Sequence, residues 1–191
     1  MIKVECNGGV HEFSSETTVG KVIKKVYGKK SGAIAALVND EEKDLSHLLL
    51  NNCKVELIDA SSKEGAYIIK HSCAHLLAQA VTELFPNAKP TIGPPIEEGF
   101  YYDFYMDPID ENDLRKIEKL MKKIIKQNIP IQREEHNNET LREMFSDNPF
   151  KIEIMDEKIG EEVGSSAYWQ GKFVDLCRGP HVESTGKLKW F

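Results

Sequence analysis

The sequence contains little cysteine and no long apolar run. Only four of its 191 residues are cysteines, and neither their number nor their spacing fits a disulfide framework. No stretch approaches 18 consecutive apolar residues, which excludes an apolar membrane-spanning helix. The first residues alternate in polarity as a strand does and lack a signal-peptide core. We therefore expect a reduced, cytoplasmic protein that does not enter a membrane.

An excess of basic residues is also missing. The sequence has 25 lysines and arginines against 31 acidic residues, which gives a formal net charge of −6. This balance excludes a generally basic surface for nucleic acid, so RNA would have to be bound through local groups. The hydrophobic content of 40% is sufficient for a core, in one large domain or two small ones.

Residues 1–60 have the pattern of a small domain rich in strands. Asn7-Gly8-Gly9 between two alternating segments predicts a hairpin, and Thr17 or Thr18 is expected to cap a short helix. A polar turn is predicted over Asn39–Lys43. The predicted strands are Ile2–Cys6, Val10–Phe13, Ala33–Val38 and Lys54–Ile58. This order of strands, helix and strands indicates a β-grasp-like domain.

Residues 61–191 are expected to form a second domain, which begins with a long helix. Ser61-x-x-Glu64 is a capping-box pattern, and it predicts a helix from about Lys63 to Phe85. The apolar stripe of this helix comprises Ile69, Cys73, Leu76, Leu77, Ala80 and Leu84. That stripe lies nearly opposite His71 and His75. We therefore expect the two histidines to leave the helix away from its main buried face.

The rest of this domain alternates between strands and helices. Asp110 is expected to cap a helix with an apolar side, and a hairpin around Gly171 is expected to deliver Cys177 at a strand end. The apolar side carries Leu114, Ile117, Met121 and Ile124, and a solvated side carries Lys116, Lys119, Lys122, Lys123 and Lys126. The other expected strands are Gly99–Tyr105, Ile129–Arg133 and Tyr168–Leu176, and the short helices are Glu139–Phe145 and Pro149–Ile159. We predict an α+β fold, with a helix packed on a mainly antiparallel sheet.

Two paired motifs carry the chemistry. His71-Ser-Cys-Ala-His75 places two imidazoles at i and i+4, on one face of the predicted helix. Asp175-Leu-Cys-Arg-Gly-Pro-His181 places a thiol and an imidazole four residues apart. Brought together, His71, His75, Cys177 and His181 would form a compact cluster of nitrogen and sulfur donors. Such a cluster suits a tetrahedral zinc ion or proton transfer on a bound substrate, and both interpretations remain open.

The residue strings around these motifs resemble the N-terminal region of bacterial-type threonyl-tRNA synthetases. The matching strings are His71–Ala80, Ile92-Gly-Pro94, Glu98–Asp103 and Asp175–His181. Residues 1–60 resemble the TGS domain of that family, and residues 61–191 resemble its editing domain, which alanyl-tRNA synthetases share in variant form. The resemblance implies that the aminoacylation core, with its ATP, Mg and zinc sites, would follow Trp190-Phe191. We therefore expect the chain to be truncated before that core.

The resemblance also implies a function, which is post-transfer editing by hydrolysis of mischarged seryl-tRNA(Thr). A pocket for threonine rejects serine weakly, because a missing methylene is worth only ~1–3 kcal/mol, and a second hydrolytic site is the usual remedy. The implied partner is the acceptor end of tRNA(Thr) carrying serine, with the rest of the synthetase in cis. The full-length enzyme would use ATP to ligate threonine to tRNA(Thr), and a homodimer is expected only for that form.

By the same resemblance, six residues form the catalytic set. They are His71, His75, Cys177, His181, Lys151 and Asp175, with Tyr102 and Arg178 as candidates for binding the substrate. His71 and His75 would position or deprotonate the attacking water, and Lys151 would stabilise the oxyanion. Asp175 would hold the substrate ammonium or orient a histidine. We expect no cofactor for this reaction. If zinc binds the four-donor cluster, Cys177 becomes a thiolate ligand and the metal would activate the water.

Two other functions remain open from the sequence. The first is a non-catalytic tRNA-binding or regulatory module, in which the four donors hold a structural zinc ion. The second keeps the hydrolase but changes its substrate to alanyl-tRNA, against which the TGS-like domain argues. The individual residues also have simpler interpretations. Without the resemblance, Lys151 would be taken for a surface lysine and Asp175 for the polar side of a strand.

Overall fold

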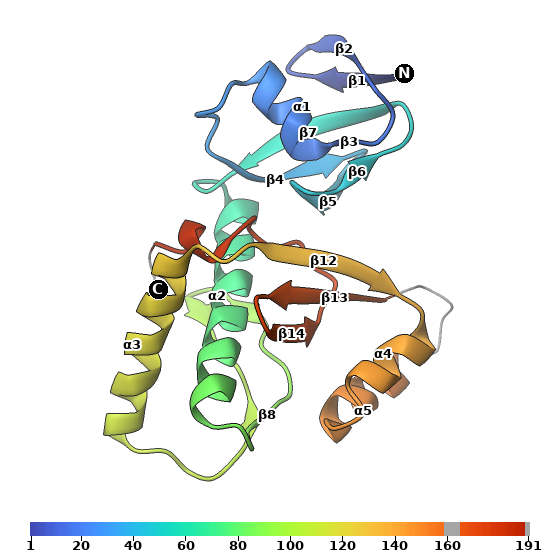
Figure 1. Cartoon of the computed structure of the whole chain (residues 1–191). Coiled ribbons are helices and arrows are strands. Elements are labelled where there is room, and N and C mark those ends of the chain that lie inside the picture. Colours follow the sequence, from blue (N-terminus) through green and yellow to red (C-terminus); the bar gives the residue numbers. More distant parts are fainter. Residues whose placement is uncertain (159–164, 190–191) are drawn as a thin grey trace. The chain divides into compact units, whose positions relative to one another are not determined.

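A computed structural model describes residues 1–158 and 165–189 of the chain (Figure 1). It confirms a mixed fold of helices and mainly antiparallel sheets, as predicted for an α+β protein. The spatial contacts between its residues divide the chain into two units. The first unit comprises Met1–Ile69 and Gly179–Glu183, and the second comprises Lys70–Arg178 and the segment from Ser184 onward. The assignment of residues 1–60 to a TGS-like domain and of 61–191 to an editing domain stays a prediction.

The first unit is built on a five-stranded sheet in the order β2-β1-β7-β4-β5. Its strands are β1 (Ile2–Cys6), β2 (Gly9–Phe13), β4 (Ala33–Val38), β5 (Glu41–Asp44) and β7 (Cys53–Asp59). Only the pair of β1 and β7 is parallel. The predicted β1–β2 hairpin is confirmed. Its turn needs two positive φ angles, which Asn7 (52°) and Gly8 (73°) provide.

Helix α1 (Val19–Val26) and the short pair of β3 (Thr17–Thr18) and β6 (Leu48–Leu49) complete the first unit. The predicted cap is confirmed, because the Thr18 side chain accepts a hydrogen bond from the backbone N–H of Lys21. The core of this unit is mainly apolar and includes Val4, Cys6, Val19, Val22, Ile23 and Val55, although Thr17 and Asp44 are buried as well. Cys6 and the half-buried Cys53 are therefore packing residues, as expected.

The predicted turn over Asn39–Lys43 is wrong in its extent. Only Asn39 and Asp40 form the turn, with φ angles of 49° and 68°, and Glu41–Asp44 continues as β5. This strand pairs with β4 at the edge of the sheet. Charged side chains are common on edge strands, where they oppose pairing with other chains. The polar composition of the segment therefore belongs to an edge strand and not to a loop.

Helix α2 spans Lys63–Leu84, close to the predicted range, but its cap differs from the prediction. Ser62 caps the helix, because its Oγ accepts a hydrogen bond from the N–H of Gly65 at 2.9 Å. The predicted cap, Ser61, instead donates from its N–H and its Oγ to the carboxylate of Asp59. The Asp59 side chain thus holds Ser61 in a turn before the helix, so that the next serine is free to cap it.

The side of α2 that carries the histidines is buried as well as the apolar stripe, which the sequence did not indicate. His75 is 5% exposed and Gln79 is 2% exposed, and Cys73 and Leu76 on the apolar stripe are buried too. Gln79 accepts a hydrogen bond from the side chain of Gln170, so the histidine side of the helix meets the sheet of the second unit. A helix at the centre of a domain is covered on both sides, and a stripe identifies only the more apolar one.

Four two-residue strands follow α2 where one aromatic-rich strand was predicted over Gly99–Tyr105. They are β8 (Lys89–Pro90), β9 (Pro95–Ile96), β10 (Gly99–Phe100) and β11 (Phe104–Tyr105). β10 pairs with β9, and β11 pairs with β8. The predicted strand is therefore broken at Tyr101–Asp103, where the chain changes partner. The hydroxyl of Tyr102 at this break reaches a buried carboxylate, as described below.

Helix α3 (Glu111–Gln127) begins with the predicted cap at Asp110, which forms a capping box with Asp113. Ile117, Met121 and Ile124 are buried as predicted, whereas Leu114 is 56% exposed and lies outside the core. The five lysines of the other side are exposed, which confirms a solvated face. A 3-10 turn at Thr185–Lys187 lies against this helix, because Thr185 Oγ1 donates to the carbonyl of Ile124.

The sheet of the second unit has the order β12-β13-β14 (Figure 1). Its strands are β12 (Ile131–His136), β13 (Ser165–Gln170) and β14 (Phe173–Leu176), and the helices α4 (Asn138–Met144) and α5 (Pro149–Lys158) connect β12 to β13. The predicted strands and helices are present with shifted ends, and Ile159 of the predicted second helix lies outside the described residues. Gly171 turns the hairpin with a φ of 67°, as predicted. Among the described helices, none combines the length and apolarity needed to cross a membrane.

Candidate active site

The centre of the candidate site is the carboxylate of Asp175 on β14. Its side chain is almost fully buried, with the residue 1% exposed. Oδ1 lies 2.5 Å from Nζ of Lys151, and Oδ2 accepts a hydrogen bond of 2.5 Å from the hydroxyl of Tyr102. Nε2 of His75 lies 3.6 Å from the same Oδ2. Three predicted site residues, from three different segments of the chain, therefore meet at one buried carboxylate.

Lys151 reaches this carboxylate from the first turn of α5. The residue is 3% exposed, so its simpler interpretation as a surface lysine is wrong. Asn148 positions that turn, because its Oδ1 accepts from the backbone N–H groups of Phe150 and Lys151. Nζ of Lys151 also donates to the hydroxyl of Tyr102 at 3.1 Å. An ammonium group is rarely buried without a charged partner, and Asp175 supplies that partner.

The electrostatics of the carboxylate follow from these contacts. Burial alone would raise the pKa of Asp175, but Lys151, His75 and the hydrogen bond from Tyr102 lower it below the usual value. Burial and the neighbouring Asp175 carboxylate raise the pKa of the Tyr102 phenol well above its usual value. At neutral pH the site therefore contains an ionised carboxylate and a phenol that keeps its proton.

Gly93 holds Tyr102 in place, and this role was not predicted from the sequence. A Cβ atom at Gly93 would lie 2.1 Å from Cδ2 of the Tyr102 ring, so only glycine fits there. The backbone N–H groups of Thr91 and Asp103 donate to the carbonyls of Asp103 and Ile92, which clamps the two segments together. The Ile92-Gly-Pro motif was the available signal, but its spatial partner could not be read from the sequence.

His75 is held as a neutral imidazole. Burial lowers its pKa from 6.5 to about 3, although the Asp175 carboxylate opposes this shift, and the nearby His71 and Lys151 add to it. Its ring lies edge-on to that of Phe173, with centroids 6.5 Å apart. A neutral imidazole has one nitrogen that accepts and one that donates a hydrogen bond. His75 can therefore orient a water molecule or bind a metal without first losing a proton.

His71 and Cys177 complete the part of the predicted cluster that lies within the second unit. Sγ of Cys177 is 3.3 Å from Nε2 of His71, and the rings of His71 and His75 are perpendicular with centroids 5.3 Å apart. The candidate donor atoms of these three residues lie within 4.8 Å of one another. Cys177 follows β14 directly, and its N–H donates to the carbonyl of Ser166, which fixes the end of the strand. Two imidazoles and a thiol at such distances fit the ligand preferences of zinc.

The two remaining predicted residues follow Cys177 along the chain. Arg178 is exposed and lies outside the buried carboxylate centre. His181 is buried and belongs to the segment Gly179–Glu183, which groups with the first unit. Within that unit its backbone N–H donates to Oδ1 of Asp44 at 2.8 Å. Because only three residues separate it from Cys177, the chain limits the distance between their Cα atoms to ~14 Å.

A cavity of about 540 Å³ opens within the second unit, and it reaches the charged pair. Lys151 and Asp175 form part of its lining, together with groups from the end of α2, from β8, from the α4–α5 connection and from β14. Its size is within the range of sites for small ligands. Thus a buried ammonium, a carboxylate and a phenol meet beside two imidazoles and a thiol, next to a space that could accept a substrate. This set can orient water, stabilise an oxyanion and move protons.

Comparison with known proteins identifies similar sequences. The family described as "Threonyl and Alanyl tRNA synthetase second additional domain" matches residues 165–191. Threonine–tRNA ligase of Thermoplasma volcanium is 49% identical over 168 residues, which is 88% of this chain, and that of Thermotoga maritima is 45% identical over 195 residues, which is 100% of it. The same enzyme of Marinobacter nauticus is 42% identical over 189 residues, or 97% of the chain.

The chain spans only part of these curated relatives. It covers 24% of the Thermoplasma volcanium enzyme, 30% of the Thermotoga maritima enzyme and 29% of the Marinobacter nauticus enzyme. The match of the family description is confined to the segment that begins at β13 and contains Asp175 and Cys177. Over nearly its whole length, the chain is therefore similar to one region of threonyl-tRNA synthetases. The segment that carries Asp175 and Cys177 is similar to a domain that these enzymes share with alanyl-tRNA synthetases.

Proposed function

We propose that this chain hydrolyses seryl-tRNA(Thr) and is the editing part of a threonyl-tRNA synthetase. The observation that carries the proposal is the buried Lys151–Asp175 pair with Tyr102 and His75, next to a cavity. Burying two charges is costly, and apolar side chains of similar volume would often stabilise a fold equally well. A buried and strongly perturbed group beside a cavity is a typical feature of an active site.

In this proposal Lys151 binds the ester carbonyl and stabilises the oxyanion that forms when water attacks. Its Nζ is already desolvated, so its charge acts more strongly than it would in water. Asp175 acts as a positioning residue. Both of its oxygens are already engaged, Oδ1 by Lys151 and Oδ2 by Tyr102. This makes it better suited to hold those two side chains than to bind the ammonium of the substrate.

The two histidines orient and deprotonate the attacking water. His75 is neutral and accepts a hydrogen bond from the attacking water, which orients it. His71, at a ring distance of 5.3 Å, takes up the proton that the water loses and returns it to the ribose oxygen as the ester bond breaks. The nearby Asp175 carboxylate helps to orient the ring of His75 towards the water. Cys177 forms the opposite wall of the site, and His181 stays the predicted second residue of that wall. Proton-transfer assistance of this kind is typically worth ~10²–10⁴ in rate.

We propose that this reaction requires no metal. The three donors His71, His75 and Cys177 nevertheless fit zinc, and their proximity favours one alternative, in which the chain is a non-catalytic tRNA-binding module with a structural zinc ion. In either case these three residues would be the ligands within the second unit, with His181 as the fourth. A zinc ion with an open position would supply an activated water.

The wider assignment follows the similarity to threonyl-tRNA synthetases. The first unit has a central parallel pair of strands, two flanking hairpins and one helix, which supports the proposal of a TGS-like domain of β-grasp type. The complete protein would ligate threonine to tRNA(Thr) with ATP, act in the cytoplasm and form a homodimer. Because the chain spans about a third or less of its curated relatives, these activities would reside in the rest of the protein.

The test is the deacylation of seryl-tRNA(Thr) by this chain, with threonyl-tRNA(Thr) and alanyl-tRNA(Ala) as controls. We expect serine to be released with both controls spared, at an unchanged rate after dialysis against a zinc chelator. Rapid hydrolysis of alanyl-tRNA would assign the chain to the other substrate. A folded protein that hydrolyses none of the three esters, contains one zinc per chain and unfolds on chelation would establish the structural-zinc module instead.

A further inference from the structure

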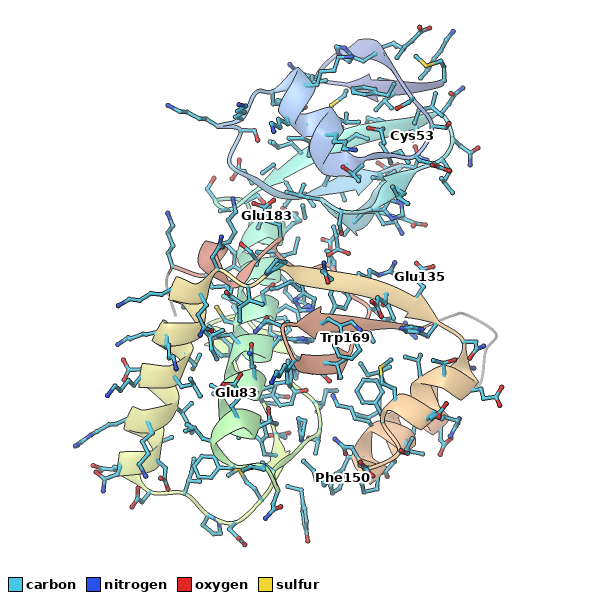
Figure 2. All side chains as sticks on the ribbon, viewed as in Figure 1. Cys53, Glu83, Glu135, Phe150, Trp169 and Glu183 are labelled. Atoms are coloured by element: carbon cyan, nitrogen blue, oxygen red, sulfur yellow. The ribbon has the colours of Figure 1, made fainter. Side chains whose placement is uncertain are left out.

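The side chain of Lys70 makes contacts that the proposed reaction does not use. It leaves α2 one residue before His71, and its Nζ donates hydrogen bonds to the carbonyls of Ile96, at 3.1 Å, and of Glu97. Figure 2 labels Glu83 near the opposite end of the same helix. The two carbonyls lie at the tip of the β9–β10 hairpin, because Ile96 ends β9. Lys70 therefore connects the helix that carries both histidines to this tip.

The β9–β10 hairpin is weak by itself. It has two residue pairs, and Pro95 in one of them has no N–H to donate. Neither of its two turn residues, Glu97 and Glu98, has the positive φ angle that two-residue hairpin turns favour. The β1–β2 hairpin, in contrast, has five residue pairs and such a turn. Ile96 is 47% exposed, so apolar packing adds little at the tip, and a contact from outside the hairpin is needed to fix it.

The hairpin is the middle of a loop that carries Tyr102. Residues 91–103, which we call the Tyr102 loop, are closed at the base by backbone hydrogen bonds between the two ends. Tyr102 packs in one apolar cluster with Ala74 and Ala78 of α2. These alanines follow Lys70 at intervals of four residues, on the same face of the helix. The loop therefore runs along this face of α2, and Lys70 holds the end that packing leaves exposed.

We propose that Lys70 is a positioning residue, which holds the Tyr102 loop against α2 so that the Tyr102 hydroxyl meets the carboxylate of Asp175. Tyr102 and His75 both approach Oδ2 of Asp175, one from the loop and the other from α2. The two can reach one oxygen together only while the loop keeps its place along the helix. The effect on catalysis rests on the proposed function, which this inference deepens, whereas the anchoring does not depend on it.

An ammonium group suits this anchor better than a neutral side chain does. It has three donors and can bind two carbonyls at once. Hydrogen bonds from a charged donor are also stronger than those from a neutral one. Arginine retains the charge and several donors, whereas methionine keeps much of the length of lysine and loses both. Lys70→Arg and Lys70→Met therefore separate the hydrogen bonds from the bulk of the side chain.

The first experiment measures hydrogen exchange of the Asp103 amide by NMR on the whole chain. This amide donates to the carbonyl of Ile92 at 2.9 Å, so it exchanges only when the loop opens. Opening also breaks the bonds from Lys70, and we expect Lys70→Met to accelerate exchange about tenfold, the equivalent of one hydrogen bond to a charged group. Lys70→Arg should restore the protection. Lys123→Met on the solvated face of α3 is the matched control and should leave the exchange unchanged.

The second experiment tests whether Lys70 acts on the reaction through Tyr102. Lys70 lies outside the described lining of the cavity and outside the carboxylate centre, so Lys70→Met should lower kcat for seryl-tRNA(Thr) about tenfold with KM nearly unchanged. In Tyr102→Phe the hydroxyl that Lys70 positions is absent. Adding Lys70→Met to that variant should therefore lower kcat by less than about twofold. A tenfold loss in both backgrounds would show that Lys70 acts by another route, which would overturn the proposal.

The exchange measurement separates this inference from the proposed function, because it requires no hydrolysis. If exchange responds to Lys70→Met and is restored by Lys70→Arg but no serine is released, the anchor stands and the hydrolase assignment fails. If serine is released but Lys70→Met changes neither exchange nor kcat, the hydrolase stands and the anchor fails. Faster exchange with an unchanged kcat would make the contact of Lys70 merely structural and would overturn its role in positioning Tyr102.

Discussion

The two units of this protein bury different kinds of side chain. The core of the first unit consists mainly of apolar side chains, with Val4, Val22 and Val55 fully buried in it. The second unit buries an ammonium, a carboxylate, a phenol and an imidazole in direct contact. Both interiors are shielded from solvent, but the interior of the second unit contains charges that stability alone does not require. The difference indicates that the first interior is built for folding and the second for chemistry.

Removing one charge of the buried pair should have the largest effect. In Lys151→Met the carboxylate of Asp175 would stay buried without its cationic partner, which is expected to cost ~3–5 kcal/mol of unfolding free energy and to abolish hydrolysis. The change is measured from the urea midpoint of the second unit. Adding Asp175→Asn should restore much of the stability but none of the activity.

Lys123→Met on α3 is the matched control for that comparison. Lys123 is exposed, and its loss is expected to change the unfolding free energy by less than ~0.5 kcal/mol. If Lys151→Met and Lys123→Met were equally stable, the ammonium of Lys151 would not be buried against Asp175. The distinction between the two interiors would then disappear.

Gly93→Ala tests how Tyr102 is positioned. The new Cβ would lie 2.1 Å from the ring, so Tyr102 must move away from Asp175, at an expected cost of about 3 kcal/mol in unfolding free energy. Hydrolysis should fall together with stability. Gly99→Ala is the control, because a Cβ at that position meets nothing within 4 Å. Normal activity of Gly93→Ala would show that the contact between Tyr102 and Asp175 is not needed.

A deletion in the apolar interior should separate stability from activity. Val55→Ala removes two methyl groups from the core of the first unit and is expected to lower its unfolding free energy by about 2 kcal/mol. The rate of serine release per folded molecule should remain unchanged. This rate is compared with the urea midpoint of the first unit at a temperature at which both units are folded. A loss of rate beyond the unfolded fraction would show that the first interior also serves the chemistry.

The buried imidazole of His75 should make stability depend on pH. Its pKa is 6.5 in the unfolded chain and is lowered to about 3 in the folded one, so the unfolded chain takes up a proton first as the pH falls. Stability should therefore decrease below pH 6.5, by up to ~1.4 kcal/mol per pH unit, until the folded imidazole is protonated as well. The difference in urea midpoint between the unaltered chain and His75→Gln, followed through this range, isolates the contribution. No pH dependence of that difference would mean that His75 is not buried as a neutral group.

Local signals in the sequence predicted much of the fold. The Asn7-Gly8 turn, the Thr18 and Asp110 caps and the Gly171 hairpin depend on interactions within a few residues, and all are present in the structure. One error, the choice of Ser61 as the cap of α2, is also local, because Asp59 holds Ser61 in a turn. The larger errors arose where distant parts of the chain intervene. The aromatic segment Gly99–Tyr105 has the composition of one strand, but it is divided because β10 and β11 pair with different partners.

The candidate site shows the same division between local and distant information. Spacing alone placed His71 and His75 on one face of a helix, and the ring distance of 5.3 Å agrees with it. The spacing did not indicate that His75 would be buried, because that depends on a strand about a hundred residues away in the chain. Gly93 was also overlooked as a site residue, since its role depends on the ring of Tyr102, whose position only the folded chain defines.

By itself, the sequence determined the chemical groups available and the local elements that carry them. Caps, turns and the spacing of donors act over short stretches of chain, where the backbone geometry leaves few choices. The tertiary structure alone decided that Lys151 and Asp175, 24 positions apart, would face each other in a buried place. That pairing depends on the packing of α5 against β14 within the second unit. Burial then makes the lysine and the aspartate a strongly coupled pair, because water no longer screens their charges.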